Sequence, residues 1–178
     1  MANGIKLSAR DLEQIRTDQG ESLLELSRKK PVLMVFLRHL GCTFCREALR
    51  DLSAYQKDSR GEKSEIVLVH MERAEIAESV FTNYGLAGCK HITDQQQVLY
   101  QKFGLSRGSF SQLFGFRTMV RGFQSGFSWD QLGGHQFGDA FQMPGIFVIY
   151  QGRIVSQYIH KKISDRPDYH NLIECCLS

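Results

Sequence analysis

The chain has 178 residues with 22 basic and 19 acidic side chains, a net charge of +3, and 42% of its residues are hydrophobic. This composition excludes intrinsic disorder, which requires few apolar residues and a high net charge, and no collagen-like or heptad repeat runs through the chain. The length predicts a single domain over residues 1–178 that is large enough to bury a core. Because the sequence contains neither a long apolar run nor the apolar segment of a signal peptide, we expect no membrane association and a cytoplasmic location.

The first elements predicted along the chain are a short helix, a buried strand and a longer helix. Residues 8–15 form an amphipathic pattern that opens with Ser8 and, three residues later, Asp11, which together indicate a capped helix start. Residues 32–37 are a continuous apolar run, which is typical of a strand buried on both faces of a sheet. From Cys45 onward, apolar residues recur with the period of a helix; they are Ala48, Leu49, Leu52 and Tyr55.

Strands and helices continue to alternate through the middle of the chain. Residues 66–71 predict a second strand, and residues 77–84 predict a helix that Gly85 ends. Strand, helix, strand and helix in this order predict parallel strands joined by right-handed crossovers. A further short strand is expected near residues 86–92 and a further helix over about residues 95–103.

The C-terminal part predicts a hairpin followed by a helix. Residues 146–150 and 154–159 are two strand-length runs, and Gln151 and Gly152 form the turn between them. The last helix is expected to start near Pro167.

Residues 105–142 form an insertion in which aromatic residues are separated by glycines. A stretch of this length without regular structure is uncommon in a compact domain and is often functional. Three interpretations remain open: the insertion buries its own rings, it forms a wall of a substrate site, or it forms the interface of a homodimer.

Neither nucleic acid nor a metal ion is predicted as a partner. The basic residues are scattered, and the tightest groups, at residues 28–30 and 160–162, are not interleaved with the aromatic residues of a single-strand binding surface. Five cysteines are an odd number, which argues against a framework of disulfides. A zinc site would need a second pair of ligands at a matching spacing. We therefore expect no metal and no organic cofactor.

The chemistry of this sequence is concentrated at Cys42-Thr43-Phe44-Cys45, between the end of a buried strand and the first turn of an amphipathic helix. Helix N-termini carry unpaired N–H groups and a partial positive charge, which favour a thiolate over a thiol. The three-residue offset brings both sulfurs within reach of one disulfide, so one cysteine can attack and the other can resolve. The alternative is that the two cysteines are buried and take no part in any reaction.

The helical phase distinguishes the two cysteines. Cys45 lies three residues before Ala48 and four before Leu49, so it shares the buried face of the helix. Cys42 lies just outside the helix and is expected to be the more exposed. Exchange with protein disulfides therefore predicts Cys42 as the nucleophile and Cys45 as the resolving cysteine.

Met143-Pro144 stands immediately before a predicted strand, in a tight turn of the kind where cis X–Pro bonds occur. Together with the cysteine motif, it makes the chain resemble the thioredoxin-like superfamily over about residues 20–175. The resemblance implies an α/β fold with a central mixed sheet flanked by helices and a cis-proline loop facing the cysteine pair. It also implies that Thr43, Phe44, Met143 and Pro144 contact the substrate or partner.

Longer stretches resemble the peroxiredoxin-like branch of that superfamily. They are residues 38–47 and 138–145, and residues 92–105 look like the insertion that alkyl-hydroperoxide-reductase/thiol-specific-antioxidant (AhpC/TSA) proteins add to thioredoxin. This branch includes selenoprotein-L-like proteins and the prostamide/prostaglandin F synthase relatives. The resemblance implies an antioxidant enzyme, a thiol–disulfide oxidoreductase that cycles a Cys42–Cys45 disulfide against a reductant such as thioredoxin or glutathione.

Two other functions remain open. The first is a thiol peroxidase, in which a thiolate attacks a hydroperoxide to give a sulfenic acid and the neighbouring thiol closes the disulfide. There the order of the pair reverses, since Cys45 takes the peroxidatic position. The second is a binding protein that holds an apolar ligand in the aromatic insertion and does not use Cys42 or Cys45.

The sequence departs from peroxiredoxins at two positions. A threonine usually stands three residues before the peroxidatic cysteine, and Cys42 stands there if Cys45 is peroxidatic. An arginine usually stands three residues before the phenylalanine of the late strand, and counting back from Phe147 reaches Pro144. Both departures favour disulfide exchange over peroxide reduction.

Charged residues next to the motif are candidates for tuning it. A peroxide-activating arginine would have to be Arg38 or Arg46. His39 and Arg46 flank the pair and are candidates for stabilising the thiolate. Cys89 and the adjacent cysteines at residues 175–176 are expected to pack in the interior.

Overall fold

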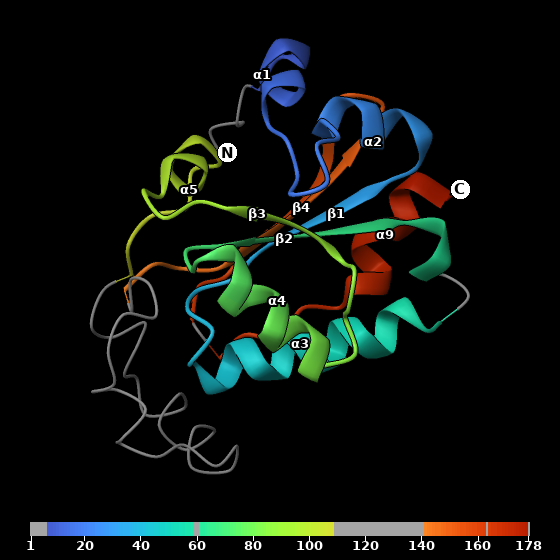
Figure 1. Ribbon diagram of the computed structural model, residues 1–178. Coiled ribbons are helices and arrows are strands. Elements are labelled where there is room, and N and C mark those ends of the chain that lie inside the picture. Colours follow the sequence, from blue (N-terminus) through green and yellow to red (C-terminus); the bar gives the residue numbers. More distant parts are fainter. Residues whose placement is uncertain (1–6, 59–60, 109–140, 163, 178) are drawn as a thin grey trace.

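The computed structural model describes residues 7–58, 61–108, 141–162 and 164–177. Its centre is a five-stranded sheet in the order β3-β2-β1-β4-β5 (Figure 1). β1, β2 and β3 are parallel, β4 is antiparallel to β1, and β5 is antiparallel to β4. The strands are β1 (Val32–Phe36), β2 (Glu65–His70), β3 (Lys90–Thr93), β4 (Gly145–Tyr150) and β5 (Arg153–Ile159). The predicted βαβ order, the C-terminal hairpin and the mixed sheet are confirmed.

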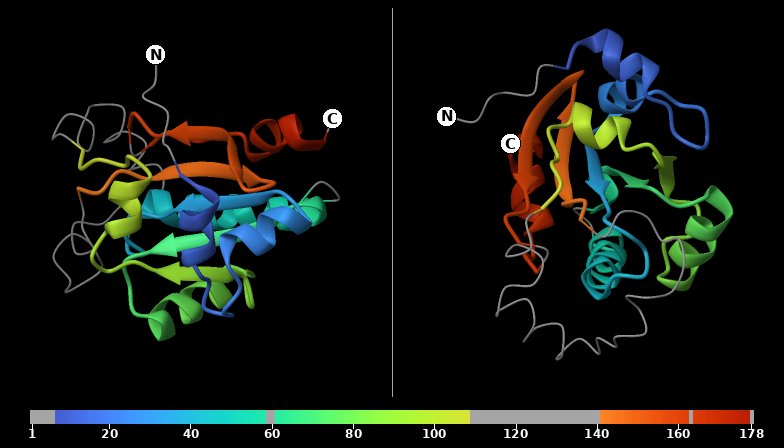
Figure 2. Two further views of the ribbon diagram at one scale, coloured as in Figure 1. Left: turned by 90° about the horizontal axis from the view of Figure 1, so that it is seen from above. Right: turned by 90° about the vertical axis from the view of Figure 1, so that its left-hand side faces the viewer.

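Helices cover both faces of this sheet. One face carries α1 (Ala9–Gln14), α2 (Leu23–Lys29) and α5 (Val98–Lys102), and the other carries α3 (Thr43–Gln56), α4 (Ala74–Asn83) and α9 (Tyr169–Leu177). The views in Figures 1 and 2 show the two layers of helices on opposite sides of the strands. A short 3₁₀ helix, η1 (Gly61–Lys63), precedes β2.

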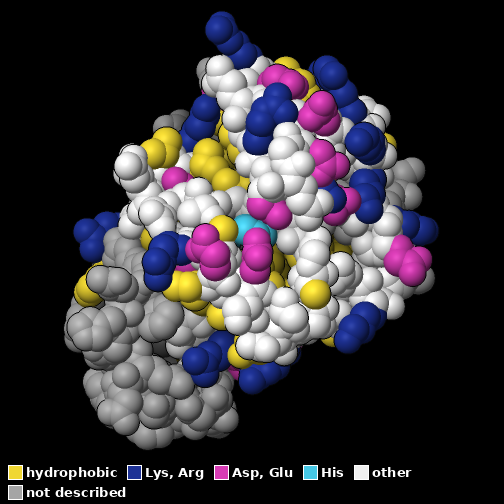
Figure 3. Space-filling view, in the orientation of Figure 1, with side chains coloured by type: hydrophobic (Ala, Val, Ile, Leu, Met, Phe, Trp, Pro, Cys, Tyr) yellow, Lys and Arg dark blue, Asp and Glu magenta, His cyan; other side chains and the backbone are white. Residues whose placement is uncertain are grey.

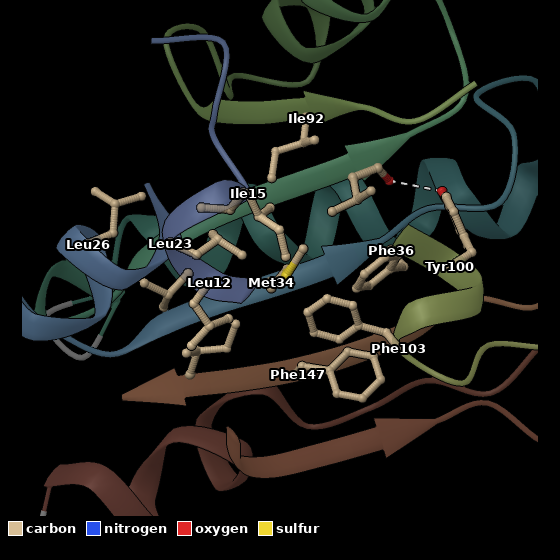
Figure 4. Close-up of a cluster of buried hydrophobic side chains, with 14 of the residues drawn as sticks. Leu12, Ile15, Leu23, Leu26, Met34, Phe36, Ile92, Tyr100, Phe103 and Phe147 are labelled. Carbon is tan, nitrogen blue, oxygen red and sulfur yellow. Dashed lines mark hydrogen bonds between the residues drawn. The ribbon is translucent and has the colours of Figure 1, made fainter. Parts of the chain in front are cut away.

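The core divides into two clusters because side chains of a strand point alternately to opposite faces. Met34 and Phe36 of β1 join the cluster under α1, α2 and α5, whereas Leu33 and Val35 join the cluster under α3, α4 and α9. All five residues of β1 are buried, as the continuous apolar run predicts. Figure 4 shows the first cluster, in which the rings of Phe36, Phe103 and Phe147 meet at centroid distances of 4.9–5.6 Å.

The ends of the helices follow local sequence rules. The Ser8 hydroxyl accepts from the Asp11 amide while the Asp11 carboxylate accepts from the Ser8 amide, so the predicted cap is present. Gly85 adopts a φ of 75° after α4, a conformation that glycine takes at little cost, and the next amide bonds back to the Phe81 carbonyl.

The Met143–Pro144 bond is trans, so the expected cis bond is wrong. The trans form is the intrinsically favoured one for X–Pro, by about 0.5–1 kcal/mol. The chain enters β4 already extended, because Gln142 forms an antiparallel bridge with Arg107 and the Met143 amide donates to the Ser106 carbonyl.

The two ends of the predicted insertion lie side by side at this point. The Gly108 amide donates to the Phe141 carbonyl at 2.7 Å. The central part of the insertion, residues 109–140, lies outside the described residues, and the predictions made for it stay predictions.

The surface of the described residues carries mixed charge. Figure 3 shows basic and acidic side chains interspersed over one face, without a large patch of one sign. Within the described ranges, no helix combines the length and the apolarity needed to cross a lipid bilayer.

Candidate redox site

Cys42 precedes α3 and occupies its N-cap position. Its backbone is extended, with a φ of −73° and a ψ of 132°, and its side chain makes no capping hydrogen bond to the amide groups of the first turn. The tight turn before it is closed by the Cys42 amide, which donates to the His39 carbonyl at 3.0 Å. The sulfur therefore lies at the end of a helix where unpaired N–H groups concentrate.

The two cysteines differ less in exposure than predicted. Cys42 is 8% exposed and Cys45 is 5% exposed, so Cys42 is the more exposed of the two as predicted, but by a small margin, and both are buried. The position outside the helix was predicted correctly, but the helical phase carries no information about segments that come from elsewhere in the chain. Pro144 and His160, at the two ends of the C-terminal hairpin, line the same cavity and enclose the pair.

The two thiols are free, and their pKa values move in opposite directions. The Cys45 thiol donates a hydrogen bond to the Cys42 sulfur, and this bond, with the nearby positive charge of Arg38, lowers the pKa of Cys42 from 9.0 to about 6. The amides of Phe44 and Cys45 act in the same direction, and burial opposes them. The same shared proton, together with burial, raises the pKa of Cys45 well above its usual value.

Arg38 is the charged side chain that lies beside the pair. It is 5% exposed, and its guanidinium donates to the Cys42 sulfur at 3.6 Å. A cation at this distance favours the charged form of a neighbouring thiol. Arg46, predicted as a stabiliser, lies further along α3 and lines a separate hollow with Arg50 and Tyr84. His39 is half-buried in the turn that its carbonyl closes.

A cavity of about 40 Å³ adjoins both sulfurs. Arg38 and the expected partner-binding residues Phe44 and Pro144 contribute to its lining. Met143 is buried and packs against Phe44, so the turn before β4 meets the cysteine motif as predicted. Thr43 is also buried, with its hydroxyl making no hydrogen bond among the described residues.

The predictions from sequence did not assign two ring side chains of this cavity to the site. His160, at the end of β5, has its pKa lowered to about 4 by burial. Burial also raises the pKa of Tyr169, and the nearby Cys45 sulfur adds to this increase. The available signal for Tyr169 was its place on the apolar face of the last helix, which does not distinguish a site from a core.

The remaining cysteines lie away from this cavity. Cys89 donates to the Ile66 carbonyl at 3.5 Å, and burial raises its pKa to about 12, which fits the predicted packing role. Cys176 packs against the core cluster under α3, and the side chain of Cys175 lies outside the described residues. In the part of the chain that the structure describes, no cluster of three or more histidine, cysteine or carboxylate side chains is arranged to hold a metal ion.

Comparisons with solved structures identify the fold. The chain superimposes on a peroxiredoxin Q cysteine-to-serine mutant from Xanthomonas campestris with a TM-score of 0.63 over 97% of this chain and 94% of that chain, at 11% identity. A thiol:disulfide interchange protein of the DsbE type from Chlorobium tepidum gives 0.54 over 92% and 89%, at 15% identity. A peroxiredoxin-like protein from Aquifex aeolicus gives 0.55 over 83% and 70%, at 11% identity.

The chain has the thioredoxin-like fold. The resemblance to peroxiredoxin-like proteins is therefore confirmed at the level of structure. The chain is also 24% identical to a prostamide/prostaglandin F synthase from Danio rerio over 169 residues, which are 93% of this chain and 83% of the relative. No protein-family model matches the sequence.

Proposed function

We propose that this protein is a thiol–disulfide oxidoreductase in which Cys42 attacks and Cys45 resolves. The observation that carries the proposal is the place of Cys42 at the start of α3, with the Arg38 guanidinium 3.6 Å from its sulfur and Cys45 one turn further along the helix. This arrangement moves the two pKa values in opposite directions. A pKa of about 6 makes Cys42 a thiolate at neutral pH, and the thiolate is the attacking species. Cys45 keeps its proton until Cys42 has reacted.

The reaction has two exchange steps. The Cys42 thiolate attacks one sulfur of a substrate disulfide, forms a mixed disulfide and releases the other substrate sulfur as a thiolate. Cys45 then loses its proton and attacks the Cys42 sulfur, which releases the second substrate thiolate and closes the Cys42–Cys45 disulfide. Two electrons pass from the pair to the substrate, and a thiol reductant of the thioredoxin or glutathione type restores both thiols.

The proton of Cys45 becomes easier to remove during the first step. The largest cause of its raised pKa is the hydrogen bond to the Cys42 sulfur, and the negative charge of that sulfur adds to it. A mixed disulfide carries no such charge and accepts hydrogen bonds weakly. Formation of the intermediate therefore lowers the pKa of Cys45 towards the value that burial alone dictates.

A trapping experiment tests the assignment. Cys45→Ser should accumulate a mixed disulfide through Cys42 with glutathione disulfide, and Cys42→Ser should accumulate almost none, both measured by mass spectrometry. Cys89→Ser is the matched control, because it removes a buried cysteine outside the cavity and should behave as the unmodified protein. Trapping mainly through Cys45 would refute the proposed order.

Thiol peroxidase activity is the second candidate, and the small cavity favours it. The space beside the sulfurs is about 40 Å³, which suits a small hydroperoxide better than a folded protein substrate. The lowered pKa makes Cys42 the attacking sulfur here also, in contrast to the expectation from the peroxidatic position. Stopped-flow consumption of hydrogen peroxide, compared with reduction of glutathione disulfide, distinguishes the two activities, and a sulfenic-acid probe identifies the oxidised cysteine.

The Danio rerio relative adds one class of substrate to this comparison. Its name refers to prostamide and prostaglandin F, so substrates of that class belong in the same assay. A cytoplasmic location and a homodimer are further proposals, and a thiol of the thioredoxin or glutathione type is the proposed reductant.

A further inference from the structure

Arg38 is a buried cation whose charge has no carboxylate partner among the described residues. Its side chain is 5% exposed, its Nε is buried without a hydrogen-bond partner, and its recorded hydrogen bond goes to the Cys42 sulfur. Burying a charge without a partner costs several kcal/mol, which is why buried cations are paired in folded proteins. In the reduced protein, the Cys42 thiolate is the group that compensates Arg38.

A second arginine at the same cavity shows the contrast. Arg166 donates two hydrogen bonds to the Asp51 carboxylate at 2.5 and 2.7 Å, and its side chain is 60% exposed. Its charge is therefore compensated whatever the state of the cysteines. The charge of Arg38 depends on Cys42.

Oxidation removes that compensation. When Cys42 joins Cys45 in a disulfide, its sulfur becomes neutral, while the guanidinium remains charged at all physiological pH values. The oxidised protein then holds a buried cation beside a cavity of about 40 Å³. Three carboxylates, those of Glu47, Asp51 and Asp165, also line this cavity, but none of them forms an ion pair with Arg38: Asp51 pairs with Arg166, and Asp165 accepts from two backbone amides. An anion of one to a few atoms fits a space of that size.

We propose that Arg38 forms an anion subsite that the Cys42 thiolate fills in the reduced protein and that an incoming thiolate or small anion fills in the oxidised protein. The inference rests on the proposed redox cycle and adds the class of reductant, an anionic thiolate rather than a neutral nucleophile. The subsite holds the attacking sulfur next to Cys42, so the reductant attacks Cys42 and releases Cys45.

The reductive steps follow from this position. A reductant thiolate on Arg38 attacks the Cys42 sulfur, forms a mixed disulfide and releases Cys45, which takes up a proton. A second reductant thiolate attacks the reductant sulfur of that mixed disulfide and releases Cys42 as a thiolate. The reductant leaves as its own disulfide, so it loses two electrons and the cysteine pair gains them. The Cys42 thiolate then occupies the subsite again.

Competition between anions gives a thermodynamic consequence. An anion that binds the oxidised protein but not the reduced protein stabilises the disulfide by mass action. At an anion concentration about ten times its Kd, the equilibrium constant for reduction should fall by about tenfold. The same anion should slow reduction by thiols, because it occupies the position of the attacking thiolate.

The first experiment measures the reduction equilibrium against dithiothreitol couples, with alkylation and mass spectrometry as the readout. Chloride replaces gluconate at constant ionic strength, since gluconate is too large for the cavity. We expect the Cys42–Cys45 disulfide to become harder to reduce in chloride, and Arg38→Met to abolish the dependence. Arg166→Met, which removes an already paired arginine from the same cavity, should keep it. The same response to chloride in Arg38→Met and in the unmodified protein would overturn the inference.

The second experiment compares two reductants. Arg38→Met should slow reduction by glutathione about tenfold or more, since one charge-assisted contact contributes about 1.5–3 kcal/mol, but should leave reduction by a neutral trialkylphosphine within about twofold. Equal slowing with both reductants would mean that Arg38 acts only on structure and would also overturn the inference. If Arg38→Met does not fold, Arg38→Lys is measured instead. Because it keeps the charge, Arg38→Lys should keep the chloride dependence and be reduced by glutathione faster than Arg38→Met would be, and loss of the chloride dependence in Arg38→Lys would overturn the inference. Failure of the disulfide to form at all would instead refute the proposed function.

Discussion

Separate removal of Cys45 and Arg38 should raise the pKa of Cys42 in measurable steps. At a pKa of about 6, roughly nine-tenths of Cys42 is thiolate at pH 7, against about one per cent for a thiol at 9.0. Loss of the Cys45 hydrogen bond in Cys45→Ala should raise the pKa by about 1–2 units, because a hydrogen bond to a charged group contributes about 1.5–3 kcal/mol. Arg38→Met should raise it by at least about one unit through the lost charge.

The double variant makes the reasoning stricter. Burial then acts against only the amides of Phe44 and Cys45, so the pKa of Cys42 should return close to 9. Cys45→Ser keeps a hydrogen-bond donor and should leave the pKa nearer to that of the unmodified protein than Cys45→Ala does. Thiolate absorbance in the ultraviolet, followed against pH, measures each value.

Cys89 provides an internal control for accessibility. Cys42 and Cys89 are both 8% exposed, but the pKa of Cys89 is raised to about 12. In the native protein at neutral pH, iodoacetamide should therefore modify Cys42 much faster than Cys89, with mass spectrometry as the readout. Equal rates, or a Cys42 pKa at or above about 8.5, would refute the electrostatic account of the site.

Stability provides further tests. The folded pKa of Cys42 is below 9.0, so the unfolded chain binds more protons than the folded chain between pH 6 and 9. The free energy of unfolding of the reduced protein, measured by denaturant titration, should therefore rise with pH in this range. Cys42→Ser should lose that rise. His70, whose pKa burial lowers to about 4, should make stability fall as pH decreases from 6.5 to 4, and His70→Gln should remove that part. Tyr100→Phe should cost about 1–3 kcal/mol in chemical denaturation, since the single proton of the fully buried hydroxyl is shared between the Leu37 and Val69 carbonyls. Arg166→Met should cost less than about 1 kcal/mol by the same measurement, because its ion pair with Asp51 is exposed.

The fold was predictable because its elements carry strong local patterns. The apolar run of residues 32–37 has no polar position, and a strand without a polar position must be buried on both faces. Ser8 and Asp11 form a cap that depends on residues three apart, which a sequence displays directly. The helical phase also placed Cys45 on the buried side correctly.

The site was less predictable because its environment comes from distant segments. The residues that enclose Cys42 include Pro144 and His160, which lie more than a hundred positions further along the chain. Local phase cannot show what such segments cover. The sequence named Arg38 and Arg46 as candidates for activating a peroxide, and His39 and Arg46 as candidates for stabilising the thiolate. The turn before α3 instead brings Arg38 to the sulfur of Cys42.

The burial of both sulfurs also determines which substrates reach them quickly. Since neither cysteine is more than 8% exposed, a disulfide within a folded protein must displace the surrounding side chains before it can meet Cys42, whereas glutathione disulfide or a hydroperoxide presents less bulk. The lowered pKa makes Cys42 reactive without making it accessible, so reactivity and access are controlled separately. The rate constant for small disulfides should therefore exceed that for insulin even though insulin disulfides are chemically similar. A faster reaction with insulin would mean that the enclosure opens readily, and the cavity would then not select substrates by size.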